Sequence, residues 1–355
     1  MCNPSHLSSS LSLLKDLIES PSFSRNEDPT AKILISFFEK RGMNPLRQAN
    51  NVWVSHPQSS PNKPTLLLNS HHDTVKPGEG WQRNPFEATM EEDRLYGLGS
   101  NDAGGPLVAL IGAFLHFWDQ DSLPFNLILA ATAEEEISGS QGIASILPTL
   151  GPIEMGIVGE PTLLQMAVAE KGLMVLDCIA RGRTGHAARN EGINAIYQAM
   201  KDIDWFRSYS FPLESPWLGP VKMSVTQVRA GKQHNVVPDH CEFVVDVRTT
   251  ECYSNSATLA IICDHVSCDV KARSLRLNPS GIPMDHSLVL AGKKMGLEAF
   301  GSPTLSDQAL LPFPTLKLGP GDSARSHTPD EYICISEIEQ GIDTYIKLLE
   351  GLSLS

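Results

Sequence analysis

The stretch LLLNSHHDTVKP, residues 66–77, runs from a strongly apolar segment directly into two histidines and an aspartate. A short apolar run bounded by turn residues is typical of a buried strand. One interpretation of its polar end is an ordinary turn, because Asp73 and Pro77 are common turn residues. The other interpretation is a metal site, because imidazole and carboxylate groups bind metals.

The composition indicates an ordinary globular protein. The chain has 355 residues, a size that suits two domains. Hydrophobic residues make up 41% and charged residues 19%, which argues against disorder. The net charge of −13 argues against a nucleic-acid partner, because phosphate binding needs clustered Lys and Arg.

The N-terminal stretch and the cysteines indicate a cellular location. The chain starts without the basic and apolar regions of a signal peptide, and no apolar run approaches the roughly 20 residues of a membrane helix. The seven cysteines form no C-x-x-C pair. We therefore expect a cytoplasmic protein with reduced thiols and no membrane partner.

Strands and helices alternate in most of the chain. Apolar spacing predicts helices over 7–19, 30–41, 105–118, 140–147, 286–296 and 335–352, and strands over 51–55, 65–70, 125–132, 154–162 and 314–319. This alternation predicts an α/β domain with a mostly parallel sheet.

The pattern changes after residue 165. Strand, helix, two strands, helix and strand follow one another over 172–183, 192–209, 221–231, 241–250, 254–266 and 269–277. The order β-α-β-β-α-β is the ferredoxin-like pattern. We expect a discontinuous domain, 1–165 and 281–355, with an inserted α+β domain at 166–280.

Five polar clusters follow the strands predicted for the α/β domain. They are His71-His72-Asp73, Asp102, Glu134-Glu135-Glu136, Glu160 and His327. Ligands bind at the carboxyl ends of strands in open α/β sheets, so these clusters can converge on one crevice. Like charges in the Glu triplet repel, and a bound divalent cation relieves that repulsion.

The available ligands suit two metal ions. Imidazole and carboxylate without thiolate suit Zn²⁺, with Co²⁺ and Mn²⁺ as alternatives. Two histidines and three or four carboxylates suffice for two ions that share a bridging carboxylate and a bridging water. A carboxylate left free of metal would then act as the general base.

Seven motifs in order resemble one enzyme family. They are SHHDTVKPGEGWQRNPF, LYGLGSNDAGG, TAEEEISGSQG, VGEPT, GHAARNEGINAI, HNVVPDHCEFVVDVR and SHTPDEY. The chain resembles the co-catalytic zinc amidohydrolases that include acetylornithine deacetylase, succinyl-diaminopimelate desuccinylase and carboxypeptidase G. The resemblance implies a zinc-hydrolase catalytic domain with an inserted dimerisation and lid domain.

The resemblance also implies a role for each residue of the metal site. His71 and Glu160 would bind one ion, Glu136 and His327 the other, and Asp102 both. Asp73 would hydrogen-bond the ring of His71, and Glu135 would be the general base. His72 fills a variable position and is expected not to bind metal. A cis peptide bond is expected after Asp102.

Three residues of the inserted domain are expected to act on the substrate. His186 would stabilise the oxyanion in the partner subunit's site with Asn235 nearby, and Arg248 would bind the substrate's α-carboxylate. The alternatives are that His186 caps the following helix and that Arg248 forms only a surface ion pair. The resemblance departs at Glu134, where many members have Asp, and at NDAGG, which lacks a common lysine.

The expected reaction is hydrolysis of an N-acyl amino acid. The acyl group would be acetyl or succinyl and the amino acid ornithine or citrulline, as in arginine biosynthesis. A succinyl tail would need another cation, for which Lys76, Arg189 and Arg325 are candidates. The alternatives are a succinyl-diaminopimelate desuccinylase, a metallo-dipeptidase or carboxypeptidase, and a non-catalytic binding protein on the same fold.

Overall fold

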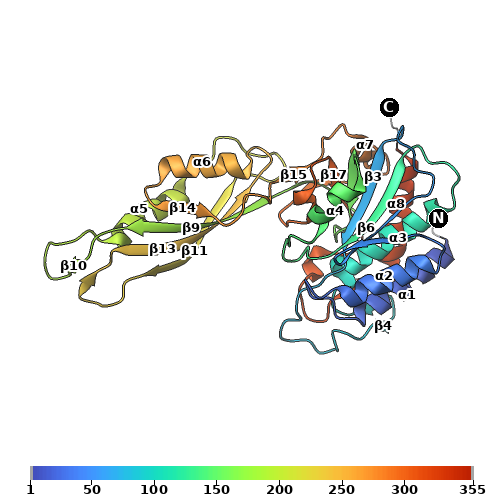
Figure 1. Ribbon diagram of the computed structural model, residues 1–355, viewed down its shortest axis with the longest axis horizontal. Helices are drawn as coiled ribbons and strands as arrows, with labels where there is room; N and C mark the ends of the chain where they lie inside the picture. Colours follow the sequence, from blue (N-terminus) through green and yellow to red (C-terminus); the bar gives the residue numbers. More distant parts are fainter. Residues whose placement is uncertain (1–2, 353–355) are drawn as a thin grey trace. The chain divides into compact units, whose positions relative to one another are not determined.

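The computed structural model describes residues 3–352, which form two compact units (Figure 1). The first unit comprises the chain up to Val168, Ile282–Phe300 and the chain from Ser306 onward. The second unit comprises Ala169–Gly281 and Gly301–Leu305. In sequence, the second unit is therefore an insertion into the first.

The first unit contains a mixed sheet whose centre is parallel. Its strands follow the order β1 (Leu46–Gln48), β2 (Asn51–Ser55), β6 (Asn126–Thr132), β3 (Thr65–His71), β7 (Met155–Val158), β17 (Thr315–Lys317) and β8 (Met166–Glu170). The pairs β6–β3, β3–β7 and β7–β17 are parallel, and the outer pairs are antiparallel. Strand β8 continues past Val168 into the second unit, where its last two residues pair with β15 (Ser280–Gly281), and β16 (Ala299–Ser302) also pairs with β8. The predicted α/β fold with a mostly parallel sheet is confirmed.

Helices cover both faces of this sheet. One face packs against α1 (Pro4–Ile18), α2 (Asp28–Glu39), α3 (Gly105–Trp118), α7 (Ser287–Lys294) and α8 (Ile335–Glu350), and the other against α4 (Ile143–Leu150) (Figure 1). Successive side chains of a strand point to opposite faces. Accordingly, Leu66 and Leu68 pack on the face covered by α1, α2, α3, α7 and α8, and Leu67 packs on the face covered by α4. This two-sided burial explains the three consecutive leucines at 66–68 of β3.

The observed helix boundaries follow local chemistry. Helix α3 has the predicted limits, and its residues are buried nearly all round. Helix α1 begins three residues earlier than predicted, because Asn3 caps it by accepting the N–H of Ser5 and Pro4 occupies its first position. The apolar spacing begins only at Leu7, so the sequence pattern alone predicted a later start.

A separate antiparallel sheet was not predicted. It contains β4 (Thr89–Glu91), β5 (Arg94–Tyr96) and β18 (Tyr332–Cys334), with β5 in the middle. Tyr96 lies opposite Tyr332 in the β5–β18 pair. The expectation that Asp102 follows a strand of the parallel sheet was wrong, since β5 belongs to this small sheet. Asp102 instead lies in the irregular turn Ser100–Gly104 that leads into α3.

The second unit has its own sheet and core. Its elements are β9 (Gly172–Arg181), β10 (Gly185–His186), α5 (Ala195–Ser208), β11 (Lys222–Ala230), β12 (Val236–Val237), β13 (His240–Thr249), α6 (Asn255–His265) and β14 (Asp269–Ala272). The four long strands follow the order β11-β13-β9-β14 with antiparallel pairing. Buried Leu176, Phe206, Phe243 and Ile262 pack together in this unit. The strand and helix order is the ferredoxin-like one.

Six of the seven cysteines lie among the described residues. Cys178, Cys241, Cys252, Cys263, Cys268 and Cys334 are free, and Cys2 lies outside the described residues. Across residues 3–352, every helix is too short or too polar to traverse a lipid bilayer.

Candidate metal centre

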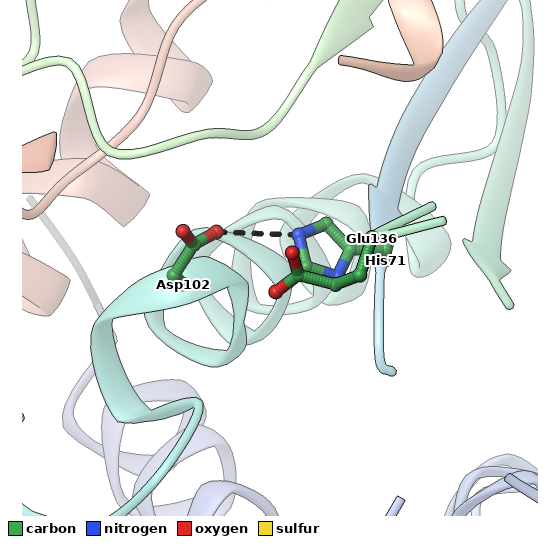
Figure 2. Close-up of side chains that lie close together, drawn as sticks. All are labelled: His71, Asp102 and Glu136. Atoms are coloured by element: carbon green, nitrogen blue, oxygen red, sulfur yellow. Dashed lines mark hydrogen bonds and ion pairs between the residues drawn. The ribbon is translucent and has the colours of Figure 1, made fainter. Parts of the chain in front are cut away.

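His71 is the last residue of β3 and is held from both sides of its ring. Its Nδ1 donates a hydrogen bond to the main-chain carbonyl of Asp73 at 3.0 Å, and its Nε2 lies 3.3 Å from Asp102 Oδ1 (Figure 2). The side chain is only 1% exposed. The Asp73 carboxylate, expected to hold the ring, lies 3.5 Å from Nδ1, so the nearer acceptor is the carbonyl of the same residue. In the neutral ring this hydrogen bond leaves the Nε2 lone pair free for a metal.

Several carboxylates crowd around the His71 ring. Asp102, Glu135 and Glu160 place oxygens 3.3, 3.8 and 3.8 Å from Nε2. A single ring nitrogen donates at most one hydrogen, so it cannot satisfy three carboxylates. The ligand atoms of His71, Asp102 and Glu136 all lie within 4.8 Å of one another (Figure 2). This concentration of nitrogen and oxygen ligands with negative charge fits a divalent cation.

Asp102 lies between two histidines. Its Oδ1 faces His71, and its Oδ2 lies 3.6 Å from Nε2 of His327. His327 Nε2 also lies 3.0 Å from an oxygen of Glu136. The peptide bond between Asp102 and Ala103 is cis, as expected. The structure thus brings together all five residues that the sequence analysis named as ligands.

The electric field of the cluster shifts the pKa of each histidine. Burial alone would lower the pKa of His71, but the charge of Glu135 and hydrogen bonding to Asp102 raise it well above its ordinary value. The hydrogen bond with Glu136, together with the charges of Glu136 and Asp102, raises the pKa of His327 to about 9. Without a metal, both histidines therefore hold a proton that a cation would displace.

The surroundings of Glu135 favour its protonated form in the metal-free protein. Burial raises its pKa well above the ordinary value, and the charges of Glu160, Asp307 and Glu136 add to this effect although His71 opposes it. A raised carboxyl pKa near a cluster of ligands is typical of a group that both accepts and delivers protons.

The main chain of the Glu triplet is held by two buried carboxylates. The N–H groups of Glu135 and Glu136 donate to the two oxygens of Asp73 at 3.1 and 3.2 Å, and that of Glu134 donates to Glu27 at 3.2 Å. Glu134 has a φ of +57°, an uncommon conformation for a residue with a side chain. Asp73 therefore positions the two glutamates, a role that the sequence analysis did not assign to it.

Glu331 is a further buried residue near the cluster, and the sequence analysis did not name it. It accepts the N–H groups of Gly99, Asn101 and Asp102 at 3.1, 2.8 and 2.9 Å. Burial and the charge of Asp102 raise its pKa to about 8. Its place in the motif SHTPDEY was the available signal, but nothing in the motif indicates that it contacts the Asp102 turn.

Two further polar residues near the cluster have contacts of their own. Asp307 accepts hydrogen bonds from Asn69 at 2.9 Å and Thr132 at 2.6 Å, and so joins the ends of β3 and β6. The ring nitrogens of His72 lie 2.9 Å from the Thr30 hydroxyl and 2.9 Å from the Asn50 carbonyl. Both His72 nitrogens thus have partners outside the ligand cluster.

The three candidate cations for an acyl tail have different surroundings. Arg325 forms two hydrogen bonds to Glu337 at 2.7 and 3.0 Å. Arg189 is exposed and lies 3.8 Å from Glu191. Lys76 is exposed, three residues after Asp73. Of the three candidates, Arg325 has the closest contacts with a carboxylate of the chain itself, that of Glu337.

In the second unit, His186 and Asn235 are neighbours. His186 ends β10 and Asn235 immediately precedes β12, and the N–H of Ala187 donates to the Asn235 carbonyl at 3.0 Å. His186 is exposed, and its Nδ1 accepts the N–H of Ala188 at 3.1 Å. Helix α5 is capped by Asn194, so His186 is not its cap.

Arg248 lies on β13 and pairs with a carboxylate of the same strand. Its Nε and Nη2 donate to the oxygens of Asp246 at 2.8 and 3.1 Å. Lys222 lies opposite Arg248 in the β11–β13 register. The alternative of an ion pair at a strand end is thus present in the structure.

The sequence of this chain matches one family model and is similar to known enzymes. The family model described as peptidase family M20/M25/M40 matches residues 67–351. Acetylornithine deacetylase of Proteus mirabilis is 31% identical, covering 82% of this chain and 80% of the relative. Acetylornithine deacetylase of Salmonella typhimurium is 27% identical, covering 91% and 92%.

Solved structures with low sequence identity share the fold. Aminopeptidase PepT of Bacillus cereus aligns with a TM-score of 0.77 at 19% identity, covering 99% of both chains. The YXEP protein of Bacillus subtilis, described as a dinuclear metal-binding peptidase of the M20 family, aligns with a TM-score of 0.74 at 15% identity, covering 98% of both chains.

Proposed function

Since this chain belongs to peptidase family M20/M25/M40 and is a hydrolase of that family, we propose that it deacylates an N-acyl amino acid. The first-choice substrate is N-acetylornithine, because the curated relatives are acetylornithine deacetylases at 27–31% identity. N-succinylornithine and the citrulline counterparts are the related candidates. The observation that carries the proposal is the position of Glu135, whose Oε2 lies 3.8 Å from His71 Nε2 beside a cluster of metal-competent side chains.

We propose that the cluster holds two divalent ions. His71 and Glu160 would hold one, Glu136 and His327 the other, and Asp102 both, an assignment supported by the short distances among these groups. When bound, such ions lower the pKa of a water molecule and polarise a carbonyl oxygen. Zn²⁺ is the first choice and Co²⁺ and Mn²⁺ are alternatives, because the ligands are imidazole and carboxylate.

Glu135 is the proposed general base. Its Oε2 lies 3.8 Å from His71 Nε2, so it adjoins the cluster. It would take a proton from the attacking water and deliver it to the leaving nitrogen. The raised pKa of Glu135 in the metal-free protein fits the second step, in which the carboxyl delivers a proton. The first step needs the ionised carboxylate, which the positive charge of bound ions would favour.

The second unit is proposed to mediate homodimerisation, and His186 of one subunit to serve the site of the other. Because Nδ1 of His186 accepts a main-chain N–H, the proton of its neutral ring lies on Nε2. Nε2 is then a donor for the oxyanion, with Asn235 beside it. The exposure of His186 supports an action outside its own unit.

Arg248 is proposed to bind the α-carboxylate of the substrate. Its bidentate contact with Asp246 shows the fork geometry that a substrate carboxylate would use. We expect Arg248→Ala to lower kcat/KM for N-acetylornithine. Arg273→Ala is the matched control, since Arg273 is another arginine of this unit paired with an aspartate, Asp177. An unchanged kcat/KM in Arg248→Ala would contradict the role.

Three other functions compete with this one. Desuccinylation of diaminopimelate is the nearest, and a metallo-dipeptidase or carboxypeptidase is the next. Glu160 favours a deacylase over a metallo-aminopeptidase or dipeptidase, since peptidases of that kind in the resembling family tend to have Asp there. A non-catalytic binding protein is the least supported, because Glu135 and every expected ligand are present.

The decisive experiment is an activity panel on metal-reconstituted protein. The panel compares N-acetyl- and N-succinylornithine, their citrulline counterparts, succinyl-diaminopimelate and simple dipeptides. We expect the highest kcat/KM for an N-acylornithine. A preference for dipeptides would replace the proposal with a peptidase, and bound metal without turnover of any compound would favour the binding protein. We also propose a cytoplasmic location, because the described cysteines are free thiols.

A further inference from the structure

Glu331 connects two segments that each carry a proposed ligand. Its carboxylate accepts three main-chain N–H groups from the turn at 99–102, including that of Asp102 itself. Glu331 is 2% exposed and lies four residues after His327. One buried side chain thus reaches from the His327 segment to the backbone of Asp102.

The turn depends on acceptors from outside itself. Asp102 has φ −120° and ψ 100°, which is not helical, and Gly99 has a φ of +74°. A side chain on Gly99 would also meet Thr74 Cγ2 at 2.5 Å. Main-chain N–H groups buried in such an irregular turn need an acceptor, and the Glu331 carboxylate serves three of them.

A second set of hydrogen bonds ties the same turn to the segment that precedes His327. The Asn101 side chain donates to the Asp322 carbonyl at 3.0 Å and accepts the Asp322 N–H at 3.1 Å. The Gly97 N–H donates to the Glu331 carbonyl at 3.0 Å. The turn at 97–102 is therefore tied to the chain both before and after His327, and this fixes Asp102 relative to that histidine.

We propose that Glu331 is a positioning residue that sets the affinity of the centre for divalent metal by holding Asp102 between His71 and His327. The inference rests on the proposed metal function. Glu331 itself would not touch the metal, because all of its described hydrogen bonds go to main-chain N–H groups. Outer-sphere partners of this kind change metal affinity or activity by roughly 10–100-fold when they are replaced.

The test measures Zn²⁺ and Co²⁺ affinity of the folded full chain by competition with a chelating dye. Glu331→Gln keeps the size of the side chain but places an NH₂ group against one of the main-chain N–H groups. We expect its metal affinity to fall by roughly 10–100-fold and its Co²⁺ absorption spectrum to change. If Glu331→Gln does not fold, Glu331→Asp, which keeps the charge on a shorter arm, is measured instead with the same expectation.

The matched control is Asp202→Asn in the second unit. Asp202 is also a buried carboxylate that accepts two main-chain N–H groups, those of Ser267 at 3.0 Å and Cys268 at 2.9 Å. Asp202→Asn should be less stable than wild type but should bind metal as wild type does. Wild-type metal affinity in Glu331→Gln, or an equal loss in both variants, would overturn the inference. Failure of the wild-type chain to bind two ions would overturn the proposed metal function itself, so the two failures are distinguishable.

Discussion

His327 Nε2 lies 3.0 Å from a Glu136 oxygen, although 191 residues separate the two in the sequence. This contact, with the charges of Glu136 and Asp102, raises the pKa of His327 to about 9. At neutral pH the metal-free protein therefore carries a charged His327. A metal ion can use this ring only after the proton has left.

The metal affinity of the centre should rise with pH. Below about 9, binding at His327 must displace a proton, so affinity is expected to increase as the pH is raised toward that value and then to level off. Isothermal titration calorimetry in buffers of different ionisation enthalpy measures the affinity and the protons released. In His327→Gln the dependence on pH should be shallower but still present, because the proton of His71 must still be displaced. An unchanged slope in that variant would contradict the assignment to His327.

The stability of the metal-free protein should show the opposite trend. The pKa of His327 is about 9 in the folded state against an ordinary 6.5, so its contribution is full below 6.5 and is lost as the pH rises through 9. Thermal unfolding of metal-free wild type over this range should therefore show a falling Tm, and His327→Gln should show a shallower fall.

Glu135→Gln should separate catalysis from metal binding. The amide cannot take up a proton, so kcat is expected to fall by roughly 10²–10⁴-fold while metal content stays as in wild type. The measurement is steady-state hydrolysis together with metal analysis of the same sample. Glu134→Gln is the control, since the Glu134 carboxylate accepts the Gln141 N–H and is not assigned to the cluster. Similar losses in both variants would speak against a special role for Glu135.

Asp73→Asn should disturb the Glu triplet through its main chain. Both Asp73 oxygens accept N–H groups, from Glu135 and Glu136, so an amide would place one NH₂ group against a donor. We expect kcat/KM to fall by roughly 10–100-fold. Ser24→Ala, which removes only the hydroxyl that donates to Asp73 at 2.7 Å, should have a much smaller effect. Activity assays of both variants under metal saturation decide the outcome.

Leu68→Ala should be strongly destabilising. Leu68 lies on β3 and is fully buried in the main core, so the substitution leaves a cavity between the sheet and its helices. The free energy of unfolding should fall by about 2–5 kcal/mol. Leu46 on β1 is 56% exposed, and Leu46→Ala should change stability by about 0.5 kcal/mol or less. Urea unfolding of the two variants measures the difference.

The parallel core and its polar strand ends could be predicted because short apolar runs and the polar residues after them are visible over a few consecutive positions. Strands β3 and β6 have apolar residues on both faces. His71 ends β3, and the Glu triplet begins two residues after β6. Helix α3 was predicted with its observed limits for the same reason, since burial all round leaves an unbroken apolar run. Residues placed by a strand end are therefore accessible to sequence analysis.

Contacts between distant side chains and main-chain groups could not be predicted. Glu331 and the Asp102 N–H are 229 positions apart, and a main-chain donor leaves no trace in the identity of its residue. The strands β4, β5 and β18 have three residues each, too few to show a period of two. These short strands set the place of the Asp102 turn, which explains why that turn was assigned to the wrong sheet.

The spread of the cluster along the chain sets the order in which it can form during translation. His71, Asp102, Glu136 and Glu160 leave the ribosome well before His327, and β17 of the central sheet also follows the first four. Under the proposed assignment, Asp102 serves both positions and is held by Glu331, so a nascent chain can complete neither position before Glu331 is made. Both positions therefore await the last tenth of synthesis, which supplies His327 and Glu331.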